Sequence, residues 1–124
     1  MNSFLLDTNA LLWWLENNQK LTSRQRKVIE NPRNSIFVSS VCVWEISIKK
    51  ATGKLKAPND LVRKIKENKF FELRVSFEHA LKVEDLPEFH NDPFDHLLIA
   101  QAMVEKMTVL TSDKRFKEYK VKVI

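Results

Sequence analysis

Short apolar runs alternate along the chain with segments in which apolar residues recur at helical spacing. The runs that predict strands are Ser3–Asp7, Ile36–Val38, Phe70–Val75 and Thr108–Thr111, with a short final edge strand at Val121–Ile124. The segments that predict helices are Ala10–Asn17, a helix capped by Thr22 or Ser23 and running to about Glu30, Val41–Thr52, Pro58–Asn68, Phe77–Leu86 and Asp92–Lys106. This order favours an α/β fold, with a mainly parallel, twisted central sheet of four to five strands flanked by helices.

Length and composition narrow the class of protein. A chain of 124 residues without repeats or linkers is expected to form one domain, residues 1–124. No apolar stretch approaches the ~20 residues of a membrane span, and the N-terminus does not resemble a signal peptide. The single cysteine, Cys42, excludes intrachain disulfides and cysteine zinc sites. We expect Cys42 in the core of a cytoplasmic protein.

Four acids, Asp7, Glu45, Asp95 and Asp113, stand at strand ends or on apolar helix faces. A buried acid is costly unless it is paired or binds a metal. Because these acids are far apart in the sequence but occupy similar positions, we expect them to share one site. An all-carboxylate site favours a hard divalent cation, Mg²⁺ or Mn²⁺.

Two of these acids follow strands. Asp7 ends the apolar run at the start of the chain, and Asp113 follows Thr111 and Ser112. Asp7 alone fits the cap of the next helix equally well, and Asp113 alone fits a polar turn. The carboxyl ends of parallel strands, beside a reversal of strand order, are where open α/β sheets place their sites, which favours a functional role for both.

Glu45 and Asp95 lie within predicted helices. Glu45 can pair with Lys49 one turn later, but it shares its face with apolar Val41, Cys42 and Ile48 and is expected to point inward. Asp95 shares its face with Leu98, Ile99, Ala102 and Met103, although it could also reach back to the helix cap. Asp92, just before Pro93, is predicted to be that cap rather than a ligand.

The charge of the chain is compatible with a polyanionic partner. The formal net charge is +5 and the pI about 9.4. Nine Lys or Arg and three Asp or Glu lie between Lys49 and Arg74, and a second basic cluster follows Asp113 and comprises Lys114, Arg115, Lys117, Lys120 and Lys122. Basic residues beside a carboxylate site suit a phosphodiester substrate, while a simple solubilising surface is the alternative interpretation.

Other residues carry weaker signals. The three histidines show no metal-ligand spacing, and His90 and His96, near the acids, are expected to form hydrogen bonds or lie at the surface. Trp13, Trp14 and Trp44 favour the core or a protein interface over base stacking. No zinc-protease, P-loop or dinucleotide-binding motif is present.

Four segments together resemble the PIN-domain ribonucleases, specifically the VapC-type toxins of prokaryotic toxin–antitoxin modules. The segments are Leu5–Leu12, Ser39–Ile46, Asp92–Ala102 and Leu110–Asp113. The resemblance carries the four acids of the family's site onto Asp7, Glu45, Asp95 and Asp113. Relatives often have His at the position of Asn9 and Arg at that of His96, which bears on substrate contacts and not on metal binding.

The resemblance implies a Mg²⁺- or Mn²⁺-dependent endoribonuclease that cuts structured cellular RNA such as tRNA or rRNA. It also implies a VapB-like antitoxin and a homodimer, for which the apolar first helix with Trp13 and Trp14 is a candidate surface. Asp7 and Asp95 would be the principal ligands of a cation that activates water, and Glu45 and Asp113 would complete its shell. Thr8, Asn9, Thr111 and Ser112 are expected to orient ligands or water.

Two other functions compete with this interpretation. A phosphatase that uses Asp7 as a covalent nucleophile usually needs a second acid two residues later, where this chain has Asn9. A PIN-like module that binds RNA or protein without catalysis is the other alternative, and the presence of all four acids argues against it.

Overall fold

The central sheet is entirely parallel. The computed structural model describes residues 2–124, and its strands are β1 (Ser3–Leu6), β2 (Ser35–Ser39), β3 (Phe71–Leu73) and β4 (Thr108–Leu110). They pair in the order β3-β2-β1-β4. The chain therefore moves outward from β1 to β2 and β3 and then returns to the other side of β1 with β4. This reversal beside β1 confirms the expected setting for a site.

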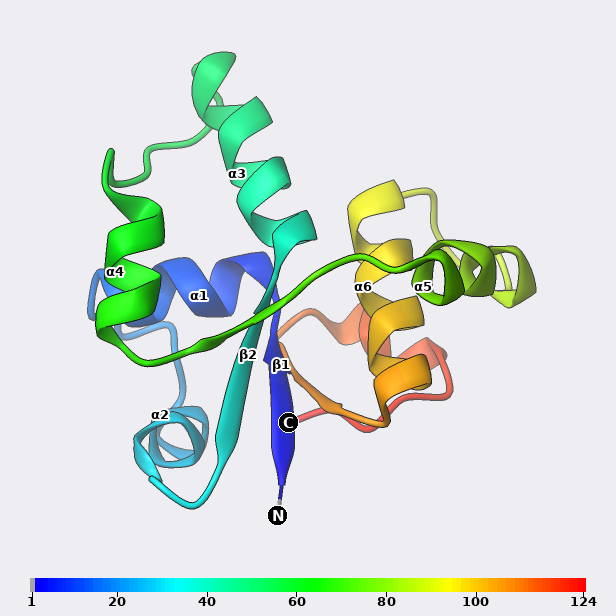
Figure 1. The fold of residues 1–124 in the computed structure, drawn as a ribbon, viewed down its shortest axis with the longest axis horizontal. Helices are drawn as coiled ribbons and strands as arrows, with labels where there is room; N and C mark the ends of the chain where they lie inside the picture. Colours follow the sequence, from blue (N-terminus) through cyan, green and yellow to red (C-terminus); the bar gives the residue numbers. More distant parts are fainter. Residues whose placement is uncertain (1) are drawn as a thin grey trace.

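Helices cover the sheet on two sides. They are α1 (Thr8–Leu15), α2 (Ser23–Glu30), α3 (Ser40–Ala51), α4 (Leu61–Glu67), α5 (Phe77–Lys82) and α6 (Pro93–Glu105), with short 3-10 helices η1 (Val83–Asp85) and η2 (Lys114–Glu118). Figure 1 shows α1, α2 and α4 to the left of β1 and β2, and α5 and α6 to their right. Within residues 2–124, no helix is long and apolar enough to cross a membrane. The parallel sheet and the helices beside it make an α/β fold, as predicted.

The core is centred on β1 and β4. Leu5 and Leu6 of β1, and Val109 and Leu110 of β4, are completely buried. Such strands are apolar on both faces because helices cover a parallel sheet on both sides. Leu6 is in register with Val38 of β2 and with Leu110. The residues that follow these three strands therefore emerge at the same edge of the sheet.

Local sequence signals set several helix ends as predicted. Thr22 caps α2 in a capping box, in which its side chain accepts from the Gln25 N–H and the Gln25 side chain accepts from the Thr22 N–H. Gly53 follows α3 with a φ of 73°. Its N–H donates to the Lys50 carbonyl, and the Lys54 N–H donates to the Lys49 carbonyl. This left-handed closure is easiest for glycine.

Several predicted elements are shorter than expected. The segment Val121–Ile124 forms one parallel bridge, between Val109 and Val123, rather than a strand. Strand β3 keeps three of the six residues expected at Phe70–Val75, and α4 begins at Leu61 rather than Pro58. The helix expected at Phe77–Leu86 is α5 followed by η1. These are edge or terminal positions, where few neighbours reinforce a regular backbone.

The tryptophans differ in burial. Trp14 of α1 donates to Asn68 Oδ1 at 2.9 Å and packs near Phe70, so α1 receives cover from its own chain. Trp44 of α3 is 57% exposed, which rules out the core position, and Ile48 one turn later is also exposed. The expectation that Ile48 points inward with Glu45 was therefore wrong, because the buried stripe of α3 runs through Val41, Cys42, Glu45 and Ile46.

Candidate functional site

Asp7 lies directly after β1 and is both a helix cap and a buried acid. Its Oδ1 accepts from the Ala10 N–H at 2.8 Å, which caps α1. Its other carboxylate oxygen, Oδ2, accepts from the hydroxyl of Thr111, which follows β4. Its own N–H donates to the Leu110 carbonyl at 3.2 Å. Asp7 is only 6% exposed, so both adjoining strands fix its position.

Glu45 projects from α3 toward the same strand end. It is 7% exposed, and its Oε1 accepts from the Thr8 hydroxyl at 2.6 Å. Its Oε2 pairs with the ammonium group of Lys49. The inward orientation and the ion pair considered in the sequence are therefore both present.

Asp95 and Asp113 meet through an arginine. Arg115 Nη2 lies 3.2 Å from Asp95 Oδ2 and 2.7 Å from Asp113 Oδ2. Asp113 also accepts from the Arg115 N–H at 3.0 Å, which caps η2. Asp92 caps α6 as predicted, by accepting from the N–H groups of Phe94 and Asp95.

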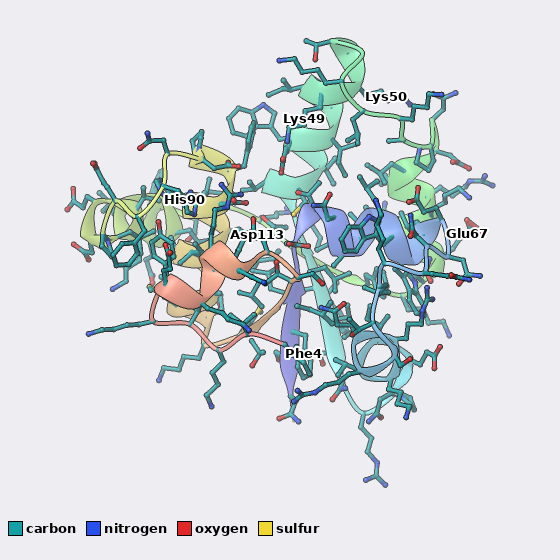
Figure 2. The ribbon with its side chains drawn as sticks, turned by 180° about the vertical axis from the view of Figure 1, so that it is seen from behind. Phe4, Lys49, Lys50, Glu67, His90 and Asp113 are labelled. Carbon is teal, nitrogen blue, oxygen red and sulfur yellow. The ribbon has the colours of Figure 1, made fainter. Side chains whose placement is uncertain are left out.

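All four predicted acids line one pocket of about 130 Å³ at the carboxyl ends of β1 and β4. Figure 2 shows Asp113 near the upper end of β1 and Lys49 above it on α3. The other lining residues are Thr8, Asn9, Leu12, Lys49, Leu55, Asp92 and Arg115. The fold thus gathers acids that are separated by up to 106 positions of sequence into one charged pocket.

Burial and mutual repulsion change the acidity of these groups. Burial raises the pKa of Asp7 from 3.8 to about 6, against the lowering effect of its hydrogen bonds from Thr111 and Ala10. Burial, followed by the charge of Asp92, raises the pKa of Asp95 to about 7. The hydrogen bonds from Arg115 instead lower the pKa of Asp113. It is therefore unfavourable for all of these acids to be ionised together unless a cation beyond Lys49 and Arg115 enters the pocket.

Asp7→Asn is expected to stabilise the protein when metal is removed. The Asp7 carboxyl keeps its proton up to about pH 6 in the folded state but only up to about pH 3.8 in the unfolded state. The free energy of unfolding therefore decreases as the pH rises between these two values. A shift of that size corresponds to at most about 3 kcal/mol at pH 8. Asparagine can still cap α1.

Urea unfolding in EDTA measures this effect. The Asp7→Asn midpoint should exceed that of the wild type at pH 8, and the difference should shrink by pH 4.5, where the wild-type carboxyl is protonated when folded. A lower midpoint at pH 8 would mean that the Asp7 charge stabilises the fold.

The polar residues around the acids divide into two groups. Thr111 and Thr8 hold Asp7 and Glu45, and Asn9 lines the pocket. Ser112 does not point to the acids, since its hydroxyl accepts from the side chain of Gln25.

Arg115 was recognised in the sequence only as part of a basic cluster. Its place two residues after Asp113, within one turn, was the available signal.

The histidines do not supply ligands to the acid pocket. His90 accepts from the Asp92 N–H at 3.2 Å and stacks on His96, with ring centroids 5.0 Å apart. His79 is almost fully buried and pairs with Glu105 at 2.7 Å. The expected hydrogen-bonding role is therefore found for His90, while His79 ties α5 to α6.

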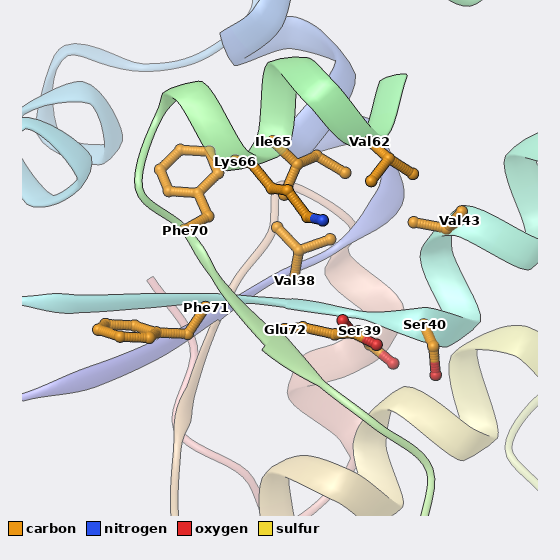
Figure 3. A pocket seen from close by; sticks show the side chains of 10 residues that line it. All are labelled: Val38, Ser39, Ser40, Val43, Val62, Ile65, Lys66, Phe70, Phe71 and Glu72. Carbon is orange, nitrogen blue, oxygen red and sulfur yellow. The ribbon is translucent and has the colours of Figure 1, made fainter. Parts of the chain in front are cut away.

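A separate hollow of about 380 Å³ has a different character. It lies between β2, β3, α3 and α4, and Figure 3 shows Val38, Val43, Val62, Ile65 and Phe70 around it. Its charged lining residues are Lys66 and Glu72. This hollow therefore holds one carboxylate, against the five that line the acid pocket.

The acid pocket contains carboxylate oxygens that are suitable ligands for a divalent cation. Ionised carboxylates offer about four lone-pair directions, so Asp7 retains acceptor capacity beside its two hydrogen bonds. Oxygen ligands are those that Mg²⁺ and Mn²⁺ prefer. In the conformation described for residues 2–124, no group of three His, Cys, Asp or Glu is already arranged to hold a metal. The contacts of Lys49 and Arg115 engage three of the four acids instead.

Comparisons with known proteins agree with this architecture. The chain resembles the solved structure of VapBC2 from Rickettsia felis with a promoter DNA fragment, with a TM-score of 0.73 and 17% identity over 98% of this chain and 97% of that one. It also resembles DNA-bound VapBC from Salmonella typhimurium, with a TM-score of 0.72 and 18% identity over 100% of this chain and 98% of that one. A third similar structure is that of FitAcB from Neisseria gonorrhoeae, with a TM-score of 0.64 and 18% identity over 98% of this chain and 96% of that one. No curated protein matches it in sequence. The family profile described as PIN domain matches residues 4–122, and the chain therefore belongs to the PIN domain family.

Proposed function

We propose that this protein is a Mg²⁺- or Mn²⁺-dependent endoribonuclease and the toxin of a VapBC-type toxin–antitoxin module. The observation that carries the proposal is the convergence of Asp7, Glu45, Asp95 and Asp113 on one pocket in a PIN-family chain. Proteins of this family typically use divalent metal ions. A bound cation would lower the pKa of its water and stabilise the negative charge that develops during phosphodiester hydrolysis.

The residues of the pocket have distinct roles in this proposal. Asp7 and Asp95, each carrying a raised pKa, are the principal metal ligands, while Glu45 and Asp113 complete the site directly or through water. Thr111 holds the Asp7 carboxylate in place through its hydroxyl hydrogen bond. Thr8 does the same for Glu45.

Cations at the pocket favour a phosphodiester substrate. Lys49 and Arg115 line the pocket with the acids, and the chain carries a net charge of +5. Lysine and arginine are the usual contacts to nucleic-acid phosphates. We therefore favour cellular RNA, with tRNA or rRNA as the expected target, over the alternative of a binding module without catalysis.

Protein partners are proposed from the similar structures, which are those of VapBC2, VapBC and FitAcB. A small VapB-like antitoxin and a second copy of the chain are the expected partners, in the cytoplasm. Trp14 is partly covered by its own chain. The exposed apolar residues Trp44 of α3 and Phe77 and Leu81 of α5 are therefore better candidates for a protein interface.

The test is cleavage of total tRNA and rRNA with Mg²⁺, with Mn²⁺ or with EDTA, by wild type and by Asp95→Asn. We expect metal-dependent cuts by the wild type that EDTA and the substitution both abolish. Unchanged cutting by Asp95→Asn would overturn the site. Metal binding by folded wild type without any cleavage of RNA would favour the binding module.

A further inference from the structure

Arg115 is bound to the oxygens that the proposed cation needs. Its Nη2 contacts Oδ2 of both Asp95 and Asp113, at 3.2 and 2.7 Å. Its Nε lies 3.1 Å from each oxygen of Asp113. The guanidinium thus bridges two acids that are 18 positions apart in the sequence, one in the first turn of α6 and one at the cap of η2.

The backbone around Arg115 favours this arrangement. Asp113 Oδ1 accepts from the Arg115 N–H as the cap of η2, which holds the two residues on the same side of a tight turn. The next residue, Phe116, is almost fully buried and anchors η2 in the core. The position of the Arg115 Cα is therefore fixed, while its side chain is 48% exposed and can move.

A divalent cation and this guanidinium are competitors. Mg²⁺ binds oxygen at about 2.0–2.1 Å with near-ideal octahedral geometry, so it needs lone pairs that Arg115 now occupies. Two like charges in one small pocket also repel each other. By contrast, Asp7 is held by neutral donors, the Thr111 hydroxyl and the Ala10 N–H. Asp95 and Asp113 are thus the acids that Arg115 must release.

We propose that Arg115 is an internal counter-cation, which occupies Asp95 and Asp113 in the metal-free protein and which a divalent cation must displace. This inference rests on the proposed function and adds a regulatory residue to the same site. The displaced guanidinium stays tethered to η2 at the rim of the pocket, where its planar set of donors suits a phosphate. Entry of the cation would then free a contact for RNA.

The experiment is calorimetric titration of Mn²⁺ into wild type, Arg115→Gln and Lys117→Gln, without RNA, at pH 8. Lys117 is an exposed cation on the same 3-10 helix and serves as the matched control for net charge. We expect Arg115→Gln to bind Mn²⁺ about five- to tenfold more tightly, a moderate change because a half-exposed ion pair competes weakly. Lys117→Gln should bind like the wild type.

The outcomes separate this inference from the proposed function. Equal or weaker Mn²⁺ affinity in Arg115→Gln, with clear binding by the wild type, overturns the counter-cation and leaves the metal site intact. An equal gain in Lys117→Gln attributes the effect to net charge and also overturns it. Binding by none of the three proteins overturns both proposals. Arg115→Lys should give intermediate affinity, because it keeps the charge but cannot bridge two carboxylates in the same way.

Discussion

Replacing Asp7 with asparagine is expected to lower the rate of metal-dependent RNA cleavage by about 10³-fold while the protein remains folded. The loss follows because a metal supplies several kcal/mol of transition-state stabilisation, and each 1.36 kcal/mol is a factor of ten in rate. Asn keeps the size of the side chain and can accept from the Ala10 N–H, so the cap of α1 survives. Single-turnover cleavage of a labelled RNA in Mn²⁺ measures the effect.

Asp92→Asn is the matched control for this experiment. Asp92 is an acid that lines the same pocket, but its Oδ1 accepts from Phe94 N and Asp95 N at 2.9 and 3.2 Å and is committed to the start of α6. We expect its substitution to reduce the rate by only about tenfold, the low end for a residue that acts through its neighbours. Comparable losses in both variants would show that the negative potential of the pocket matters and that Asp7 has no special role.

The opposite effects expected for Asp7→Asn on cleavage and on metal-free stability have one cause. A carboxylate that is 6% exposed and close to Glu45 and Asp113 is expected to destabilise the folded protein when no cation is bound. The same carboxylate is a strong ligand once a cation enters. Sites that a fold retains at the expense of its stability are characteristic of function rather than packing.

The sequence predicted that the four acids come together, because position in a parallel sheet constrains where the residues after each strand lie. A residue directly after a buried strand must lie at the sheet's carboxyl edge, and β1 and β4 are in register there, so Asp7 and Asp113 approach each other. The inward orientation of Glu45 and Asp95 followed from helical periodicity, since Val41 and Cys42, and Leu98 and Ile99, are indeed buried. Asp7 both caps α1 and lines the pocket, and Glu45 both pairs with Lys49 and lines it, so the structural interpretations do not exclude a functional one.

The features that the sequence did not predict depend on contacts between distant segments. The residues around Arg115 in the sequence do not indicate that its side chain reaches Asp95 as well as Asp113. That contact depends on how α6, which carries Asp95, packs in the folded protein. The strand expected at Val121–Ile124 has the right alternation, but it pairs with β4 at one bridge only. Ile48 has helical spacing from Glu45, yet it lies beyond the edge of the core on α3.

The affinity for Mn²⁺ is expected to fall about 100-fold between pH 7.5 and pH 5.5. A cation binds the ionised carboxylates, and the pKa values are about 6 for Asp7 and about 7 for Asp95. At pH 7.5 both groups are mostly ionised, whereas at pH 5.5 about a quarter of Asp7 and about a thirtieth of Asp95 remain so. The sign is fixed because both pKa values are raised, so each proton competes with the metal as pH decreases through 7 and 6.

The Asp92→Asn variant tests whether Asp95 causes this pH dependence of Mn²⁺ affinity. The Asp92 charge is the second cause of the raised Asp95 pKa, after burial, so removing it should move the fall in Mn²⁺ affinity to lower pH. Titration of Mn²⁺ at several pH values, with free Mn²⁺ followed by electron paramagnetic resonance, measures both curves. Cleavage at low Mn²⁺ should rise with pH in the same range, and saturating Mn²⁺ should shift that rise to lower pH because the metal displaces the protons. An affinity that stays constant from pH 5.5 to 7.5 would mean that Asp7 and Asp95 are not the ligands, since no cation can bind both acids without releasing their protons.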